Sequence, residues 1–271
     1  MAWFNVLILG IVEGITEFLP ISSTGHLILF HRWFQLEPES FQNAFDVCIQ
    51  LGAILAVVVL YFRKLNPFGG IDDEGKTMTP KKRRKILELW GKVLVALLPA
   101  VVLGLLFDDL IDEYLFSTKV VAITLVVWGI VIILMEKQHR QVRFDNLNQV
   151  PYKTALGIGF FQCLAMIPGT SRSAATIIGA MFLGLSRIDA AEFSFFLAIP
   201  TMLGATFLKI VKNLHGFNAS QWLMILFGGL ISFITAYLVI RVFMNFIKKH
   251  DFIPFGIYRI IVGILVFLLF L

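Results

Sequence analysis

The sequence predicts an all-α integral membrane protein with six transmembrane helices and two re-entrant helix hairpins. Of its 271 residues, 58% are hydrophobic and only 15% are charged. The chain contains six apolar runs long enough to cross a bilayer, and two more that are broken in the middle. A water-soluble globule of this composition would be left with an apolar surface, and a disordered chain would lack these apolar residues. Lipid must therefore solvate most of the protein.

The first 36 residues predict the first hairpin. An apolar arm leads to Glu13 and Glu17, Pro20 interrupts the helix, and a second apolar arm starts at Leu27. Because this segment has no basic start and no small-residue cleavage site, we expect it to stay in the mature protein rather than to be a signal peptide. Three apolar spans follow, at residues 44–62, 91–107 and 119–136.

Residues 154–186 predict the second hairpin. Pro168, Gly169 and Arg172 break this apolar run into two halves, each too short to cross the bilayer. Helices that end at membrane depth are tolerated where they are buried in protein or line a wet cavity. Three further spans follow, at residues 190–211, 221–246 and 254–271.

The positions of the basic residues predict the topology. Segment 63–92 is rich in lysine and arginine, so the positive-inside rule places it in the cytoplasm. The alternation of spans brings loop 137–153, Arg187 and the basic residues of 241–259 to the same side and leaves both termini outside. Arg172 is then the one basic residue at membrane depth. The net charge of +5 is explained by this orientation, and no nucleic-acid partner is expected.

The chain is predicted to be a single membrane domain, 1–271, built from two repeats. Residues 1–136 hold the first hairpin and three spans, 137–153 form a cytoplasmic loop, and 154–271 hold the second hairpin and three spans. Because each half has an odd number of spans, the second half would be inverted relative to the first.

A few positions of the two halves can be matched. Aligning Pro20 with Pro168 also aligns Ser23 with Ser171. Inverted repeats with broken helices are typical of transporters, so a transporter of a phosphorylated lipid or an ion is the alternative to an enzyme. Architecture alone does not decide between them.

The first motif with chemical potential runs from Glu13 to His26. Glu13 and Glu17 are four residues apart and therefore project from one helix face. Carboxylates at membrane depth are costly and indicate a functional site. The alternative is a helix at the interface with both acids in water, but the break at Pro20 and the polar residues after it favour a site.

The hydroxyl residues Ser22, Ser23 and Thr24 follow the break. Together with free backbone N–H groups they could bind an anion, although such runs are also common turns and helix caps. His26 is three residues beyond Ser23 and could accept its proton or protonate a leaving oxygen. The alternative for His26 is a hydrogen-bonded side chain at the interface.

The second motif surrounds Arg172. A guanidinium beside free N–H groups at a helix start is suited to phosphate. The alternative is an intramembrane ion pair with Glu13 or Glu17, and both states could occur in sequence. The accompanying glycine and hydroxyl residues, which we also assign to phosphate binding, are Gly169, Thr170, Ser171, Ser173 and Thr176.

A polyanionic substrate beside two carboxylates would be repelled in a medium of low dielectric constant. A divalent cation would remove this conflict. Mg²⁺ or Ca²⁺ could be held by Glu13 and Glu17 together with phosphate oxygens.

The two motifs carry a resemblance to a known family. The segment from Glu13 to His26 resembles the E-G-x-T-E-F-L-P-x-S-S-T-G-H signature of bacterial undecaprenyl-diphosphatases, the bacitracin-resistance protein family. The segment from Pro168 to Thr176 resembles their P-G-x-S-R-S-x-x-T signature, and the similarity extends over essentially the full length. The family's catalytic positions correspond to Glu13, Glu17, Ser23, His26 and Arg172, and its phosphate-contacting positions to Ser22, Thr24, Ser171, Ser173 and Thr176.

The resemblance implies a hydrolase of the bacterial cytoplasmic (inner) membrane. It would convert undecaprenyl diphosphate, with Mg²⁺ or Ca²⁺, to undecaprenyl phosphate and inorganic phosphate, recycling the carrier for peptidoglycan and giving bacitracin resistance. The cavity is expected to open to the outer face. Attack by Ser23 or directly by water, an additional flippase activity and a homodimer all stay open at this point.

Overall fold

A computed structural model describes residues 1–115, 117–138, 141–213 and 216–270, without the side chains of 108–113, 209, 212 and 213. Within these residues the chain is helical, with isolated bridges but no strand. Residues 139–140 of the predicted loop and Leu271 of the last predicted span lie outside the described part. The helices are α1 (Ala2–Thr16), α2 (Ser23–His31), α3 (Glu39–Leu60), α4 (Phe62–Leu65), α5 (Pro80–Leu115), α6 (Thr118–Lys137), α7 (Tyr152–Cys163), the 3₁₀ turn η1 (Leu164–Met166), α8 (Arg172–Phe182), α9 (Arg187–Asn213), α10 (Ala219–Ile247) and α11 (Ile253–Phe270).

Six of the described helices are long and apolar enough to cross a membrane, as predicted. They are α3, α5 over Pro80–Phe107, α6, α9 over Arg187–Leu208, α10 and α11. The helix α5 starts well before the predicted span because its first turns carry the basic residues 81–85. Lysine and arginine are good helix formers, so the helix continues past the end of the apolar run.

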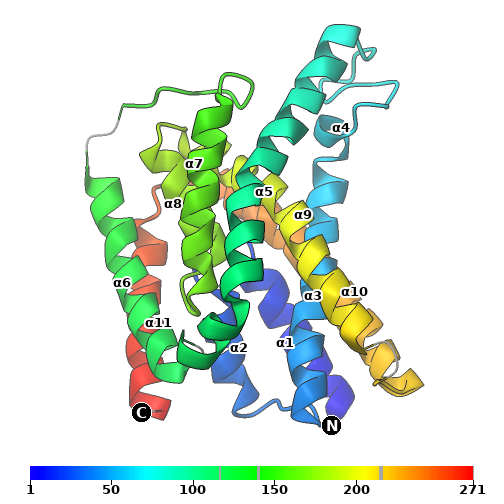
Figure 1. The fold of residues 1–271 in the computed structure, drawn as a ribbon, viewed down its shortest axis with the longest axis vertical. Coiled ribbons are helices and arrows are strands. Elements are labelled where there is room, and N and C mark those ends of the chain that lie inside the picture. The colour runs from blue at the N-terminus through cyan, green and yellow to red at the C-terminus, as the bar shows by residue number, and fades with distance from the viewer. Residues whose placement is uncertain (116, 139–140, 214–215, 271) are drawn as a thin grey trace.

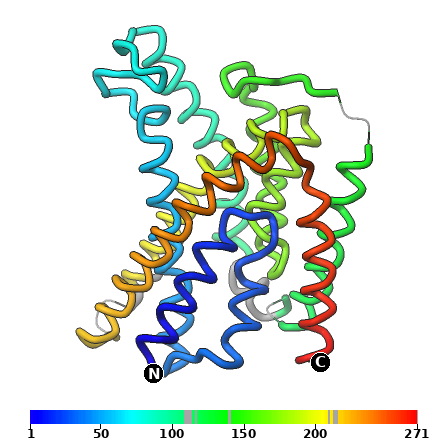
Figure 2. The backbone as a smooth tube through the Cα atoms, turned by 180° about the vertical axis from the view of Figure 1, so that it is seen from behind, coloured from blue at the N-terminus to red at the C-terminus, as the bar shows by residue number. Residues whose placement is uncertain are grey.

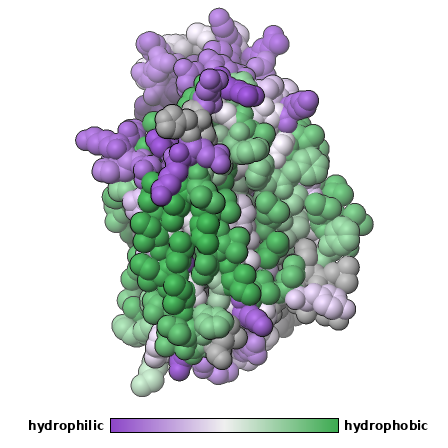
Figure 3. Space-filling view, turned by 90° about the vertical axis from the view of Figure 1, so that its left-hand side faces the viewer, coloured by the Kyte–Doolittle hydropathy of each residue, from purple (hydrophilic) through white to green (hydrophobic). Residues whose placement is uncertain are grey.

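The polar and apolar surfaces are separated along the long axis of the molecule. Both termini lie at one end, and the loop before α5 and the link between α6 and α7 lie at the other (Figures 1 and 2). The end that holds the loop before α5 is hydrophilic, and a broad hydrophobic surface lies below it in Figure 3. The basic segments 63–92 and 137–153 therefore share one end, as the charge pattern predicts.

The helices of the first half pack mainly on helices of the second half. The helix α10 packs on both α1 and α3, α6 packs on α11, and α5 packs on α7. At the α3–α10 contact a Cβ on Gly52 would lie only 2.0 Å from the carbonyl oxygen of Gly229, so only glycine allows this approach. Neither half is therefore a separately packed body.

Two short antiparallel helix pairs bring polar residues toward the middle of the bundle. The pair α1 and α2 enters from the end that holds the termini, and the pair α7 and α8 enters from the opposite end (Figures 1 and 2). We call the links between their helices loop A (residues 17–22) and loop B (residues 164–171). These loops position the site described below.

The predicted location of Arg259 is wrong. It was grouped with the basic residues of 241–259 on the cytoplasmic side, but its side chain is fully buried in α11. Arg172 is therefore not the one basic residue inside the bundle. The positive-inside rule counts charges by their place in the sequence and does not distinguish a helix end from an interior turn.

Candidate active site

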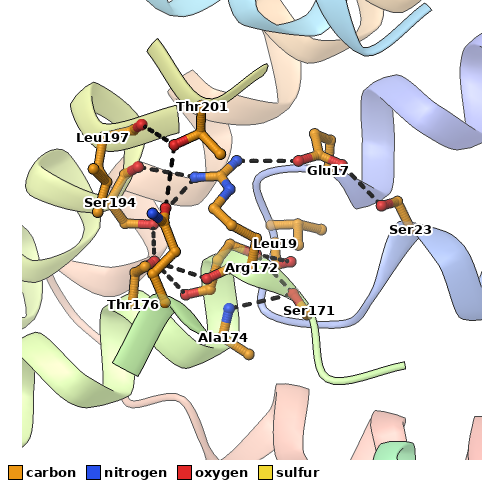
Figure 4. A network of polar contacts seen from close by, with 12 residues as sticks. Glu17, Leu19, Ser23, Ser171, Arg172, Ala174, Thr176, Ser194, Leu197 and Thr201 are labelled. Carbon is orange, nitrogen blue, oxygen red and sulfur yellow. Dashed lines mark hydrogen bonds and ion pairs between the residues drawn. The ribbon is translucent and has the colours of Figure 1, made fainter. Parts of the chain in front are cut away.

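Loops A and B meet between the two helix pairs. A guanidinium nitrogen of Arg172, Nη2, lies 3.0 Å from Oε1 of Glu17, and both side chains are largely buried (Figure 4). Ser173 Oγ donates a hydrogen bond of 2.8 Å to the carbonyl oxygen of Leu19. The ion pair that was the alternative to phosphate binding by Arg172 is present, and its partner is Glu17.

Each loop ends in a serine that caps the following helix. Ser22 and Ser171 both have φ of 73°, which is unusual for residues other than glycine. Their hydroxyl oxygens accept hydrogen bonds from the backbone N–H groups of Gly25 (3.3 Å) and Ala174 (3.2 Å). The N-termini of α2 and α8 are therefore built in the same way and lie at the same site, where two helix dipoles favour an anion.

Glu17 joins the residues of the two motifs. Ser23 Oγ donates a hydrogen bond of 2.8 Å to Oε2 of Glu17, while the other oxygen of this carboxylate binds Arg172. Arg172 Nη1 also donates to the carbonyl oxygen of Ser194 at 2.8 Å (Figure 4). The carboxylate of Glu17 is thus held in place next to a hydroxyl group that could give up its proton.

His26 is oriented away from Ser23. Its Nδ1 lies 2.7 Å from the carbonyl oxygen of Ser22, and its Nε2 lies 2.7 Å from the hydroxyl of Tyr258. A carbonyl oxygen only accepts, so Nδ1 carries the proton, and in the neutral ring Nε2 accepts from Tyr258. The direct His26–Ser23 pair expected from the spacing does not form, and Glu17 takes that place.

Glu13 is fully buried. Among the described residues no donor reaches either of its carboxylate oxygens, and the group lies beside the carboxyl of Glu17. Two adjacent carboxylates repel unless a proton or a cation lies between them. The described residues contain no group of three or more typical ligands. One or two carboxylates with phosphate oxygens and water are a usual Mg²⁺ environment, and Glu13 and Glu17 are compatible with it. Of the two, Glu17 lines the cavity described next, and Glu13 is buried and does not line it.

A cavity of about 170 Å³ opens between the loops. It is lined by part of the predicted set, namely Glu17, Ser23, Thr24, Gly169, Ser171 and Arg172, together with residues that include Gln50 and Thr201. A larger cavity of about 490 Å³ lies beside the basic start of α5, but it contains none of these residues. Chemistry rather than size therefore identifies the site.

The other predicted phosphate-binding residues are buried beside the cavity. Thr170 and Ser173 are fully buried, and Ser22 is nearly so. Thr176 Oγ1 bonds within α8 to the carbonyl oxygen of Arg172 and also lies 2.6 Å from Ser194 Oγ. None of these four residues lines the cavity.

A family model described as "Bacitracin resistance protein BacA" matches residues 6–265. The chain belongs to this family. Curated relatives of this chain include undecaprenyl-diphosphatase 1 of Clostridioides difficile, which is 52% identical and aligned over 97% of this chain and 94% of its own length. The undecaprenyl-diphosphatase of Fusobacterium nucleatum is 51% identical over 97% of this chain and 99% of its own length. That of Limosilactobacillus fermentum is 51% identical, with coverages of 97% and 95%.

Several residues around the site were not assigned a role from the sequence of this BacA family member. In α9, Ser194 accepts a hydrogen bond from Arg172, and Thr201 lines the cavity and bonds to Gln162 (Figure 4). In α11, Tyr258 contacts His26, and Arg259 contacts both loops. Arg259 had a usable signal, since a charged residue within an apolar span indicates function by default. The serine and threonine residues had none, because isolated hydroxyls are common in such helices.

Proposed function

We propose that this protein hydrolyses undecaprenyl diphosphate to undecaprenyl phosphate and inorganic phosphate in the bacterial cytoplasmic membrane. Relatives about 50% identical over nearly the whole chain carry the name undecaprenyl-diphosphatase. The observation that carries the chemistry is the carboxylate of Glu17, which joins the Ser23 hydroxyl to the Arg172 guanidinium. Glu17, Ser23 and Arg172 line one cavity, which supports their roles as general base, nucleophile and phosphate-binding guanidinium.

The substrate would bind with its polyprenyl tail in lipid and its diphosphate in the cavity. Arg172 would transfer hydrogen bonds from Glu17 to the terminal phosphate, because a planar guanidinium matches phosphate oxygens. The N-termini of α2 and α8 would add two dipoles of favourable sign. This arrangement explains why so many polar groups are gathered at a depth where charge is costly.

In the first step Ser23 attacks the terminal phosphorus. Glu17 accepts the hydroxyl proton, the Oγ–P bond forms, and the bond from phosphorus to the bridging oxygen breaks with its electron pair on the departing undecaprenyl phosphate. The proton on Glu17 then passes to the departing phosphate. Water attacks the phosphorus of the phosphoserine while Glu17 accepts a water proton, the Oγ–P bond breaks, and Glu17 returns this proton to Ser23 Oγ as inorganic phosphate leaves. The contact between Ser23 and Glu17 supports this route over proton transfer from Ser23 to His26. Direct attack of water, with Glu17 or His26 as base, is the alternative.

Glu13 and Glu17 are the residues that would hold Mg²⁺ or Ca²⁺. When bound with phosphate oxygens, the cation would offset the repulsion between carboxylates and diphosphate and stabilise negative charge on the phosphate groups. The support from the chain itself is the position of Glu13, a buried acid without a donor beside a second acid.

The nucleophile can be tested with substrate labelled on its terminal phosphate. Acid quench during turnover is expected to leave label on Ser23, and Ser23→Ala is expected to lose hydrolysis. Ser232→Ala, which removes a serine hydroxyl that is buried on α10 and does not line the cavity, is the control and should retain activity. Full activity of Ser23→Ala would eliminate the serine route. Binding of the lipid without hydrolysis in detergent, even with Mg²⁺ or Ca²⁺, would instead favour a transporter.

We further propose that the pairs α1–α2 and α7–α8 are re-entrant hairpins of an inverted repeat, 1–136 and 154–271. The matching caps at Ser22 and Ser171 support this, and they indicate that Ser22, not Ser23, corresponds to Ser171. The cavity is proposed to face outward. An impermeant thiol reagent should then label Thr24→Cys in intact cells, while Gly75→Cys in the basic loop before α5 should react only after permeabilisation.

A further inference from the structure

The buried guanidinium of Arg259 bonds to three backbone carbonyl oxygens on separate segments. Its Nη1 donates to Pro20 in loop A at 3.2 Å, and its Nη2 donates to Gly169 in loop B at 2.8 Å. Its Nε donates a longer bond of 3.4 Å to Leu125 of α6. One side chain of the last helix therefore connects both loops of the site.

The two loop contacts are equivalent. Pro20 lies two residues before the cap Ser22, and Gly169 lies two residues before the cap Ser171. Beyond these caps lie Ser23 and Arg172, the first residues of α2 and α8. The distance between the two carbonyl oxygens is limited by the width of one planar guanidinium, so Arg259 fixes the spacing of the two chain segments that lead into the reacting groups.

Burial of the Arg259 guanidinium is energetically unfavourable. Its side chain is fully buried, and within the described part of the chain no carboxylate forms an ion pair with it. Arginine stays charged in proteins, and burying a charge without a counter-ion is strongly unfavourable. Arg259 is, after Arg172, a second positive charge near the proposed diphosphate pocket. A bound diphosphate would supply its counter-ion.

We propose that Arg259 is a positioning residue of the active site that holds loops A and B at the spacing that hydrolysis requires. This inference rests on the proposed function, because the reaction needs groups from both loops around one phosphate. Without the fork of Arg259, the loops would still be joined by the Arg172–Glu17 ion pair and by the bond from Ser173 to Leu19. The ion pair opens when Arg172 turns to the phosphate, so the spacing of the loops would then be less well fixed. Misplacement by about 1 Å can reduce a rate by about 100-fold.

The test compares Arg259→Met and Arg259→Lys with a matched control. Lys92 is also buried, and its Nζ donates to two backbone carbonyl oxygens, those of Leu147 and Asn148, away from the site. With undecaprenyl diphosphate in detergent, we expect kcat to fall about 100-fold in Arg259→Met and about tenfold in Arg259→Lys, with little change in KM. Lys92→Met should keep kcat within about threefold of the wild type.

Hydrogen exchange supplies a readout that does not depend on turnover. In both Arg259 variants we expect faster exchange at Gly25 and Ala174, the amides that bond to the two serine caps, while Lys92→Met should affect only the region around 145–150. Unchanged exchange in both loops, or faster exchange with unchanged kcat, would overturn the proposal. A wild-type protein without diphosphatase activity would refute the proposed function itself, and the exchange data would still report whether Arg259 holds the loops.

Discussion

Replacing Gly169 by alanine tests whether loop B must keep its conformation. Gly169 has φ of +86°, and its carbonyl oxygen accepts the bond from Arg259. A Cβ at this position would lie 2.2 Å from Oγ1 of Thr124 and 2.8 Å from the Cα and carbonyl oxygen of Val121. Rotating Thr124 away would break the hydrogen bond of 2.6 Å that its hydroxyl donates to the carbonyl oxygen of Pro168. The other close atoms belong to the backbone of Val121 within α6, so a side-chain rotation cannot move them away.

The expected magnitude follows from these distances. Ordinary contact begins at 3.4 Å, so loop B must move by 3.4 − 2.8 = 0.6 Å to clear Val121 and by 3.4 − 2.2 = 1.2 Å to clear Thr124. A shift near 1 Å corresponds to about a 100-fold loss in kcat/KM, or about 2.7 kcal/mol of transition-state stabilisation. Overpacking should also lower the free energy of unfolding by about 1–3 kcal/mol.

The control is Gly75→Ala. Gly75 has φ of +78°, but a Cβ there meets no atom within 4 Å. Both variants carry the cost of a left-handed alanine, about 1–2 kcal/mol, and only Gly169→Ala adds the overlap. Phosphate release from purified protein and thermal unfolding in one detergent would compare the two. If Gly169→Ala keeps kcat/KM within threefold of Gly75→Ala, the argument that hydrolysis depends on the position of loop B is wrong.

Three further predictions concern charge and hydrogen bonding. Glu13→Gln replaces a buried acid that has no hydrogen-bond donor by an amide that can donate to Glu17, so the variant should unfold at a higher temperature than the wild type. It should nevertheless lose activity, and after chelation the addition of Mg²⁺ or Ca²⁺ should not restore hydrolysis. Equal stability and an unaltered cation response would contradict the assignment of Glu13. Tyr258→Phe removes the hydroxyl that bonds His26 Nε2, so we expect about a fivefold loss of kcat and a displaced pH–rate profile. An unchanged profile would show that this bond does not affect the protonation of His26. Desolvation acts to raise the pKa of Asp72 in the loop before α5, but hydrogen bonds from the Lys76 backbone N–H and the Lys82 ammonium lower it overall. The stabilisation from Asp72 is therefore complete above the unfolded pKa of about 3.9 and is lost as pH falls through the lower folded value. Hydrogen exchange at 70–78, corrected for intrinsic rates, should accelerate in acid in the wild type. In Asp72→Asn it should accelerate less, because hydrogen bonds from Lys76 and Lys82 also lower the pKa of Glu74, which leaves a smaller acid-dependent contribution.

The sequence predicts the spans well because hydrophobic length is a local property. Each of the six runs contains enough apolar residues to identify its helix, and Pro20 and Pro168 mark the breaks between the short helices. Helix starts are predicted less accurately than spans. The helix α5 begins before its predicted span, because polar residues with good helix propensity extend it beyond the apolar run. The acidic pair Glu13 and Glu17 and the lone Arg172 stand out because charge is rare in these segments.

The contacts within the site depend on long-range geometry. Ser23 is three residues from His26, but the left-handed conformation of Ser22 turns the imidazole toward the backbone and Tyr258 and leaves Ser23 facing Glu17. Nothing in the local sequence favours a positive φ at a serine. Thr176 matches a phosphate-binding position by pattern, yet its hydroxyl bonds within α8 and to Ser194. Pairing between distant helices decides these contacts.

The bond between Pro20 and Arg259 spans 239 residues of chain. During biosynthesis the first hairpin leaves the ribosome long before α11, so for nearly the whole of synthesis loop A lacks the donor that holds it. The same late helix completes loop B. Assembly of the reacting groups is therefore coupled to insertion of the final helix, and chains truncated before α11 would carry both motifs without forming a working site.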